Sequence, residues 1–305
     1  MSTVSRRALL GGFVALASAP AFAGGRRVQL RAGYVPGFEA APLFVMLGEG
    51  WPAAAGIDIA PVRFATAAEL ADAVARGLVD SYWGPVSALA FSPAAARARI
   101  VAGTTVEDVA VLSSRQGFAR LASDPARPMA TQAVKHWLAA SNRSVEVVPV
   151  AADAALDALT QGAVDAAALR EPLASAALDR AKDLRLIARG AEIFPDQPSG
   201  AFALSNDFVA ANPAQAQRLV THAVRAERLL AADPERARRP ILSALAGDLA
   251  DAATLSRALP QLRFQPDPKR LEIAAAKLGV AVPEGLFDDA AFRRLNVQNK
   301  AISIL

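Results

Sequence analysis

The chain of 305 residues is long enough for two domains, and its 53% hydrophobic content, much of it alanine, favours a helix-rich globular protein over a membrane protein. Its formal net charge of +4 argues against the strongly basic field that nucleic-acid binding requires, so no nucleic acid is expected as a partner. The absence of cysteine excludes disulfide bonds, thiolate metal sites and cysteine catalysis.

Residues 1–23 are typical of an export signal. Arg6 and Arg7 precede an apolar run at 8–17, and Ala21-Phe22-Ala23 forms a small-x-small cleavage site. The apolar run is too short for a stable membrane span. Residues 5–10 (SRRALL) resemble a twin-arginine signal, although an ordinary Sec signal would contain the same features. Cleavage near Ala23 removes two arginines and no acid, so the net charge of +4 becomes +2 in the mature exported protein.

Strands and helices alternate through the first part of the chain. Strands are predicted at 28–35, 57–62, 79–83 and 99–102, with helices at 41–48, 67–76 and from Pro85 onward. This alternation predicts a mostly parallel sheet flanked by helices.

One short module occurs twice, at residues 67–85 and 154–172. Each copy reads as an amphipathic helix, a glycine suited to the left-handed conformation (Gly77 or Gly162), an apolar strand, and a proline that opens the next helix (Pro85 or Pro172). The duplication predicts two similar α/β lobes, and two facing lobes leave a cleft for a ligand.

The remaining elements complete a second lobe and then return to the first. Strands are predicted at 109–113, 118–122, 145–150 and 184–188, with a helix at 130–140. After a loop at 195–200, a strand at 201–204 is followed by helices at 206–211, 213–232, 234–245, 252–259 and 268–278. We therefore expect lobe I to comprise 24–112 and 192–305, lobe II to comprise 113–191, and the two crossings to form a hinge.

Several motifs in this order resemble the periplasmic solute-binding proteins of ABC importers, in the nitrate, taurine, alkanesulfonate and thiamine-precursor group. They are residues 31–36 (RAGYVP), 40–45 (AAPLFV), 77–80 (GLVD), 170–172 (REP, where the group usually has Trp-Glu-Pro) and 205–213. The resemblance implies a type II periplasmic binding protein fold with a hinge, a small-molecule ligand, an ABC permease at the inner membrane as partner, and neither catalytic residues nor a cofactor. We also expect a monomer.

One segment departs from the pattern of this group. Residues 124–129 (DPARPM) replace the usual Gly-Ser or Gly-Thr turn, whose backbone N–H groups would suit an oxyanion. Prolines remove donors and Asp124 would repel an anion, whereas Arg127 could supply a bidentate grip. The choice between a sulfonate, a carboxylate and a heteroaromatic solute therefore stays open.

Ligands of open α/β sheets bind beyond the carboxyl ends of the strands. This rule predicts a ligand site formed by Tyr34, Phe38, Glu39, Ala41, Pro42, Phe64, Trp83, Gly84, Ser87, Thr104, Thr105, Arg127, Met129, Arg170 and Glu171. The aromatic members would supply flat walls, or else pack in the core; Trp83 is expected to face the cleft. Glu39 would pair with a cation or lie at the surface, and Arg170 would clamp a carboxylate or pair with Glu171.

The two histidines, His136 and His222, fall in different predicted lobes and away from strand tips, so no metal is expected. Two alternatives to solute import remain. One is a periplasmic accessory protein that assists a partner dehydrogenase, which a collapsed or apolar cleft without convergent polar groups would favour. The other is an enzyme similar to thiamine-pyrimidine synthases, which needs histidines in the cleft.

Overall fold

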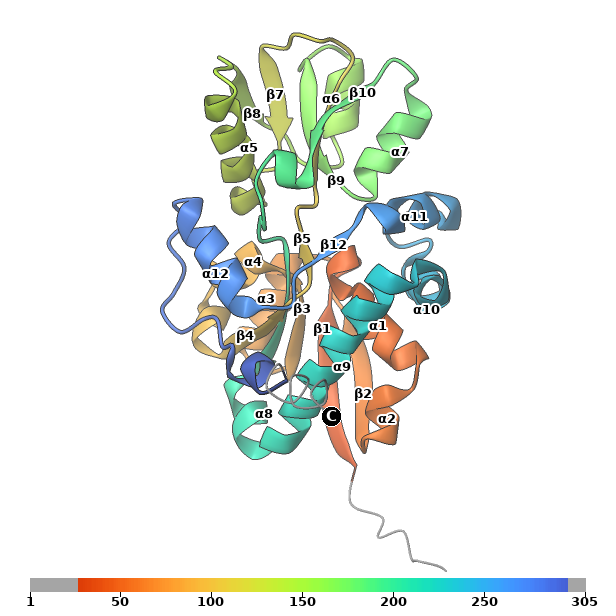
Figure 1. The fold of residues 1–305 in the computed structure, drawn as a ribbon, viewed down its shortest axis with the longest axis vertical. Coiled ribbons are helices and arrows are strands. Elements are labelled where there is room, and N and C mark those ends of the chain that lie inside the picture. Colours follow the sequence, from red (N-terminus) through yellow and green to blue (C-terminus); the bar gives the residue numbers. More distant parts are fainter. Residues whose placement is uncertain (1–26, 296–305) are drawn as a thin grey trace, which may run out of the picture.

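The computed structural model describes residues 27–295, and two five-stranded sheets form its framework (Figure 1). The first sheet has the order β2-β1-β3-β11-β4, with β1 (Val28–Tyr34), β2 (Ile57–Arg63), β3 (Ser81–Pro85), β4 (Ala98–Gly103) and β11 (Gly200–Ser205). The second has the order β10-β6-β9-β7-β8, with β6 (Val109–Ser113), β7 (Arg120–Ser123), β8 (Glu146–Pro149), β9 (Ala166–Arg170) and β10 (Arg185–Arg189). The predicted export signal lies outside the described residues.

Both sheets are mixed. Each contains two parallel and two antiparallel strand pairs, whereas the sequence predicted mostly parallel sheets. The predicted α/β architecture itself is confirmed. The antiparallel pairs arise because β11, which returns from the second sheet, enters between β3 and β4 against their direction. In the second sheet, β6 runs antiparallel to both β9 and β10.

Helices cover both faces of the first sheet. On one face, α1 (Ala41–Gly48) and α9 (Pro213–Ala232) pack against a core that includes Trp83 and Phe202. On the other face, α3 (Ala67–Ala75) and α4 (Val86–Ala90) enclose Tyr82. Adjacent residues of β3 thus enter different cores, because side chains alternate across a strand.

The second sheet is sandwiched in the same way. Met129, Ala133 and Val134 of α5 (Pro128–Ala140) pack on one face. Residues of α6 (Ala155–Thr160) and α7 (Leu173–Arg180) pack on the other, where small alanines of the strands allow the helices to approach closely.

The C-terminal third is helical, as predicted. It contains α8 (Asn206–Ala211), α9, α10 (Pro234–Leu245), α11 (Ala252–Ala258) and α12 (Pro268–Lys277); the bounds of α8, α9 and α10 match the prediction. The short helix α2 (Trp51–Ala54) was not predicted. Within residues 27–295, no helix combines the length and the apolar character needed to cross a membrane.

Three chain segments meet between the two sheets. The chain leaves the first sheet through β5 (Thr105–Val106) and returns just before β11, and Val106 bridges to Pro198 of the returning segment. The distant strand β12 (Arg263–Phe264) pairs antiparallel with β5 (Figure 1). The sequence predicted the two crossings but not this third segment.

Candidate functional site

Glu39 is the centre of a charged cluster between the two sheets. It lies in the 3-10 helix η1 (Phe38–Ala40), just beyond β1, and is 1% exposed. Its Oε1 accepts hydrogen bonds from Arg127 Nη2 at 2.6 Å and from Arg170 Nη1 at 3.0 Å. Arg127 immediately precedes α5 and Arg170 ends β9, so the second sheet contributes both guanidinium groups. Asp108 Oδ2 lies 3.6 Å from Arg127 Nη1.

The environment keeps these groups charged. Burial alone would raise the pKa of Glu39, but the guanidinium groups of Arg127 and Arg170 lower it to about 2. Burial would lower the pKa of Arg127, but the carboxylates of Glu39 and Asp108 produce a net increase. The pKa of Arg170 is lowered by burial and by the neighbouring Arg127. The two guanidinium groups therefore lie among the carboxylates of Glu39, Asp108 and Asp124 in a largely buried setting.

Several buried polar atoms of η1 and of the segments that connect the sheets lack hydrogen-bond partners among the described residues. They are Glu39 Oε2, Thr104 Oγ1, Thr105 Oγ1, Gln197 Oε1 and Ser199 Oγ. Gly200 brings several of them together, since a Cβ there would lie 2.3 Å from Thr104 Oγ1, 2.6 Å from Thr105 Oγ1 and 2.7 Å from Glu39 Cγ. Unpaired buried oxygens cost free energy, because burial removes their hydrogen bonds to water. They supply hydrogen-bonding capacity that a polar solute would use.

The space beside the cluster is small. A cavity of about 20 Å³ is lined by Asp108, Ser123, Asp124, Arg127, Arg170 and neighbouring apolar residues. This volume suits a single water molecule and no organic solute. In this arrangement the two sheets are therefore closed upon the ion pairs.

Five of the residues predicted from the sequence converge here: Glu39, Thr104, Thr105, Arg127 and Arg170. Three more, Phe38, Ala41 and Pro42, flank Glu39 along the chain and are buried. Glu171 directly follows Arg170 in the sequence, but its Oε1 lies 3.2 Å from Arg189 Nη2. The predicted alternative of an Arg170–Glu171 pair is wrong, because each residue pairs with a different partner.

The prediction that Trp83 faces the cleft is also wrong. Its ring is fully buried and stacks on Phe202, with ring centroids 4.0 Å apart, and its Nε1 donates to Ser81 Oγ at 3.2 Å. The side chain thus lies back over its own strand, on the face that α1 and α9 cover. The orientation of the Trp83 side chain is set by stacking on Phe202 of the neighbouring strand β11, although Trp83 lies near the end of β3.

The other predicted residues lie apart from Glu39 or in the cores. Tyr34 packs edge-on against Phe44, with ring centroids 5.0 Å apart, and Phe64 packs half-buried beside the core that includes Tyr82. Met129 is buried where α5 packs on the second sheet. Gly84 is packed beneath the Tyr82 ring. Tyr34, Phe64 and Trp83, which were predicted to form aromatic walls, thus pack among hydrophobic side chains of the cores.

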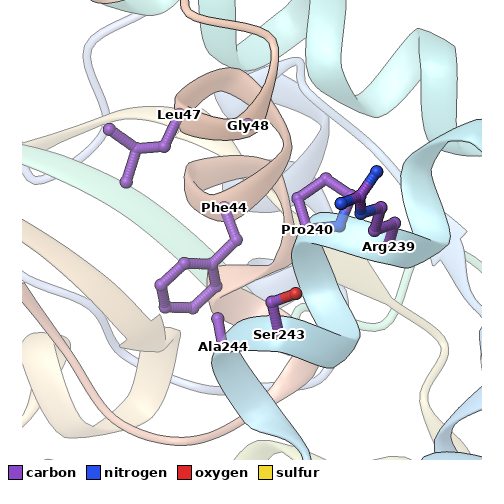
Figure 2. A pocket seen from close by; sticks show the side chains of 7 residues that line it. All are labelled: Phe44, Leu47, Gly48, Arg239, Pro240, Ser243 and Ala244. Carbon is purple, nitrogen blue, oxygen red and sulfur yellow. The ribbon is translucent and has the colours of Figure 1, made fainter.

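Ser87 lines a different cavity, a largely apolar groove of about 510 Å³. The groove is bounded by α3, by α4 with Phe91, and by Ala126 and Pro128 at the start of α5. Another groove of about 430 Å³ lies between α1 and α10, where Phe44, Arg239, Pro240 and Ser243 are among its seven lining residues (Figure 2). None of those seven residues belongs to the charged cluster.

Sequence reasoning missed Asp108, Gln197 and Ser199. All three lie on the segments that connect the sheets, of which 195–200 was predicted only as a loop. A signal for them exists in the sequence, namely polar residues on the two segments that cross between the predicted lobes. Polar residues on such segments are therefore candidates for the site.

The two histidines lie apart. His136 packs against Phe194, with ring centroids 5.7 Å apart, and His222 lies 6.3 Å from the Trp51 ring. Across residues 27–295, no cluster of three or more histidine or acidic side chains has an arrangement that could hold a metal ion. The guanidinium and carboxylate groups of the charged cluster can recognise a partner by charge and hydrogen bonding.

A model of the NMT1-like family matches residues 23–246 of the chain. No curated protein sequence matches this chain. Three solved structures have similar folds. The periplasmic aliphatic sulphonate binding protein SsuA from Escherichia coli has a TM-score of 0.66 and 15% identity, covering 83% of this chain and 88% of its own.

The alkanesulfonate-binding protein SsuA from Xanthomonas axonopodis pv. citri, bound to MOPS, has a TM-score of 0.64 and 19% identity, covering 87% of this chain and 100% of its own. The periplasmic nitrate-binding protein NrtA from Synechocystis PCC 6803 has a TM-score of 0.65 and 14% identity, covering 88% of each chain. These likenesses confirm the fold that the sequence predicted, that of periplasmic binding proteins.

Proposed function

The chain belongs to the NMT1-like family, and from this premise we propose that it is an exported protein that captures a small organic solute between two hinged lobes for an ABC importer. The lobes are residues 24–112 with 192–305, and residues 113–191. The similar structures are described as sulfonate- or nitrate-binding proteins, which supports binding rather than catalysis.

One observation carries this proposal: the convergence of Glu39 and Arg127, which follow β1 and β7, with Arg170, which ends β9. Strand ends of this kind are where open α/β sheets bind ligands. Guanidinium groups recognise carboxylates and sulfonates through paired hydrogen bonds, and Thr104 and Thr105 add hydroxyl groups. Because Trp83 lies in the core, a heteroaromatic solute has less support, and we favour a carboxylate or sulfonate.

The closed arrangement implies that capture depends on hinge motion. A cavity of about 20 Å³ cannot admit an organic solute. The solute would enter an open form, in which the ion pairs of Glu39 are separated, and would then shift the population toward closure. Closure would be the state that the ABC permease recognises.

A thermal-shift screen of residues 24–305 tests the proposal. Organic carboxylates, sulfonates, nitrate, pyrimidines and quinone cofactors would be compared, since a bound solute raises the melting temperature by linkage. Arg170→Gln should abolish the shift, whereas Arg76→Gln, at an exposed pair with Asp72, should preserve it. A shift that survives Arg170→Gln would move the solute elsewhere.

The small cavity also favours a second candidate, a periplasmic accessory protein that assists a partner dehydrogenase without binding a solute. Against it stands the convergence of charged side chains, since a protein without solute capture has no need of them. The screen separates the two candidates, because the accessory protein would respond to none of the solutes.

Export to the periplasm and a monomeric state complete the proposal. Fractionation of cells that express the full chain, or the chain from residue 24, would test whether residues 1–23 direct export. Replacing Arg6 and Arg7 by lysine would block the twin-arginine route and leave Sec export intact. Sedimentation of the mature chain would give the oligomeric state.

A further inference from the structure

The carboxylate of Glu39 stands where a bound anion would stand. A single oxygen, Oε1, accepts from guanidinium groups of two separate elements, 88 and 131 residues further along the chain. Arg127 is 13% exposed and Arg170 is 23% exposed as side chains, so the pair they form is largely withdrawn from solvent. A free carboxylate or sulfonate would offer these arginines the same oxygen acceptor.

Charge balance makes Glu39 a competitor of such a solute. Glu39 and Asp108 already pair with the two arginines, and Asp124 adds a further negative charge beside them. An added monoanion would bring uncompensated negative charge into a buried site, which is strongly unfavourable. The added anion would be fully attracted to Arg127 and Arg170 only after the Glu39 carboxylate had moved away from them.

Space leads to the same conclusion. With Glu39 in place, about 20 Å³ remains beside the two arginines, roughly the room of one water molecule. The cluster therefore cannot hold Glu39 and an organic anion at the same time. Departure of Glu39 also breaks the contacts that join η1 to the second sheet.

We propose that Glu39 is a tethered counter-ion that occupies the anion position of Arg127 and Arg170, so that a solute anion binds only by replacing it. Glu39 then determines specificity. Simple anions, which offer little beyond one charge, fail to displace it, whereas a larger solute succeeds through additional contacts, among them with Thr104 and Thr105. This inference rests on the proposed function and concerns the same site.

The experiment measures binding of acetate and methanesulfonate to the wild type and to Glu39→Gln by thermal shift and calorimetry, at constant ionic strength set with chloride. Glu39→Gln keeps the side-chain size and removes the charge, so the arginines become free to bind a probe. We expect affinity for both probes to be at least about tenfold higher in Glu39→Gln than in the wild type. Arg170→Ala in the Glu39→Gln background should remove this gain.

Glu49→Gln serves as the matched control, because Glu49 pairs with Arg236 at the surface and its loss frees no buried arginine. Equal response of the wild type and Glu39→Gln would overturn the inference, and so would failure of Glu39→Gln to bind either probe. If Glu39→Gln does not unfold cooperatively, Glu39→Ala is measured instead. Acetate should raise its melting temperature by filling the vacated carboxylate position, and an absence of that rescue would equally overturn the inference.

These outcomes are distinct from failure of the proposed function. A wild type that binds a solute from the screen, with no gain of probe affinity in Glu39→Gln, would leave the proposed function standing and remove the tethered counter-ion. A wild type that binds nothing from the screen, with a gain in Glu39→Gln, would support the counter-ion and contradict solute capture.

Discussion

Arg31 and Arg120 occupy equivalent positions in two copies of one local structure. Arg31 Nη2 donates to the carbonyl oxygen of Gly77 at 3.1 Å, and Arg120 Nη2 donates to that of Gly162 at 2.9 Å. Both glycines have positive φ, 68° and 73°, as the sequence predicted. Each copy thus fastens the end of a helix to a neighbouring strand, β1 in the first sheet and β7 in the second.

An aspartate three residues after each glycine completes the arrangement. Asp80 accepts from the Arg31 backbone N–H at 2.8 Å and from its guanidinium at 2.7 Å, and Asp165 accepts from the backbone N–H groups of Ala119 and Arg120. We expect Asp80→Ala to lower the free energy of unfolding by about 1–3 kcal/mol, because charged hydrogen bonds are lost. Urea denaturation would measure this effect. Asp72→Ala, at an exposed pair, should cost less than about 1 kcal/mol; equal costs would contradict the prediction.

Acid should weaken the protein partly through Glu39. Its folded pKa of about 2 lies below the ordinary value of 4.5, so between these values the unfolded chain binds a proton that the folded chain does not. Stability is therefore present above about pH 4.5 and declines as the pH falls toward 2, by on the order of 3 kcal/mol. Denaturation curves over this range should fall less steeply for Glu39→Gln than for the wild type. Parallel curves would show that Glu39 is not held by its arginines.

Two ion pairs, Glu39–Arg127 and Asp179–Arg257, should contribute very differently to the free energy of unfolding. Arg127→Ala leaves the Glu39 carboxylate buried with one fewer partner, and we expect a loss of about 3–5 kcal/mol in the free energy of unfolding. Arg257 pairs with Asp179, but both side chains are about half exposed, so Arg257→Ala should cost no more than about 1 kcal/mol. Chemical denaturation of both variants at neutral pH tests this ranking, and a reversed order would contradict it.

Glu227 should destabilise the folded chain at neutral pH. It is 2% exposed within α9, neither of its carboxylate oxygens has a partner among residues 27–295, and burial raises its pKa well above the ordinary value. Because the unfolded chain ionises first, stability declines as the pH rises above about 4.5. Glu227→Met should therefore increase the free energy of unfolding at neutral pH by about 1–3 kcal/mol. Below about pH 4.5 the gain should shrink, and a gain that is independent of pH would point to packing instead.

The sequence predicted most elements because their signals were local. Asn212-Pro213 and Asp233-Pro234 mark the starts of α9 and α10, which begin at the predicted residues. The duplicated module of helix, glycine, strand and proline predicted two α/β units for a similar reason. The antiparallel entry of β11 could not be predicted, since strand order depends on contacts between segments about one hundred residues apart.

The candidate site was only partly predictable. Strand ends correctly indicated Glu39, Arg127 and Arg170 as neighbours of the space between the sheets. The pairing of these three residues depends on how the two sheets close, which no local pattern encodes. Trp83 failed as a prediction because its orientation is set by stacking on Phe202, a residue on a strand that joins the sheet late in the chain.

The pairing of β12 with β5 places residues 263–264, from the C-terminal third of the chain, beside the first connection between the sheets. Arg263 and Phe264 form a short ladder with Val106 and Thr105, at the place where the chain passes between the sheets. Rotation of one half against the other must therefore twist this ladder instead of bending a free tether. Residues that lie more than 150 positions downstream thus brace the strand through which the chain leaves the first sheet.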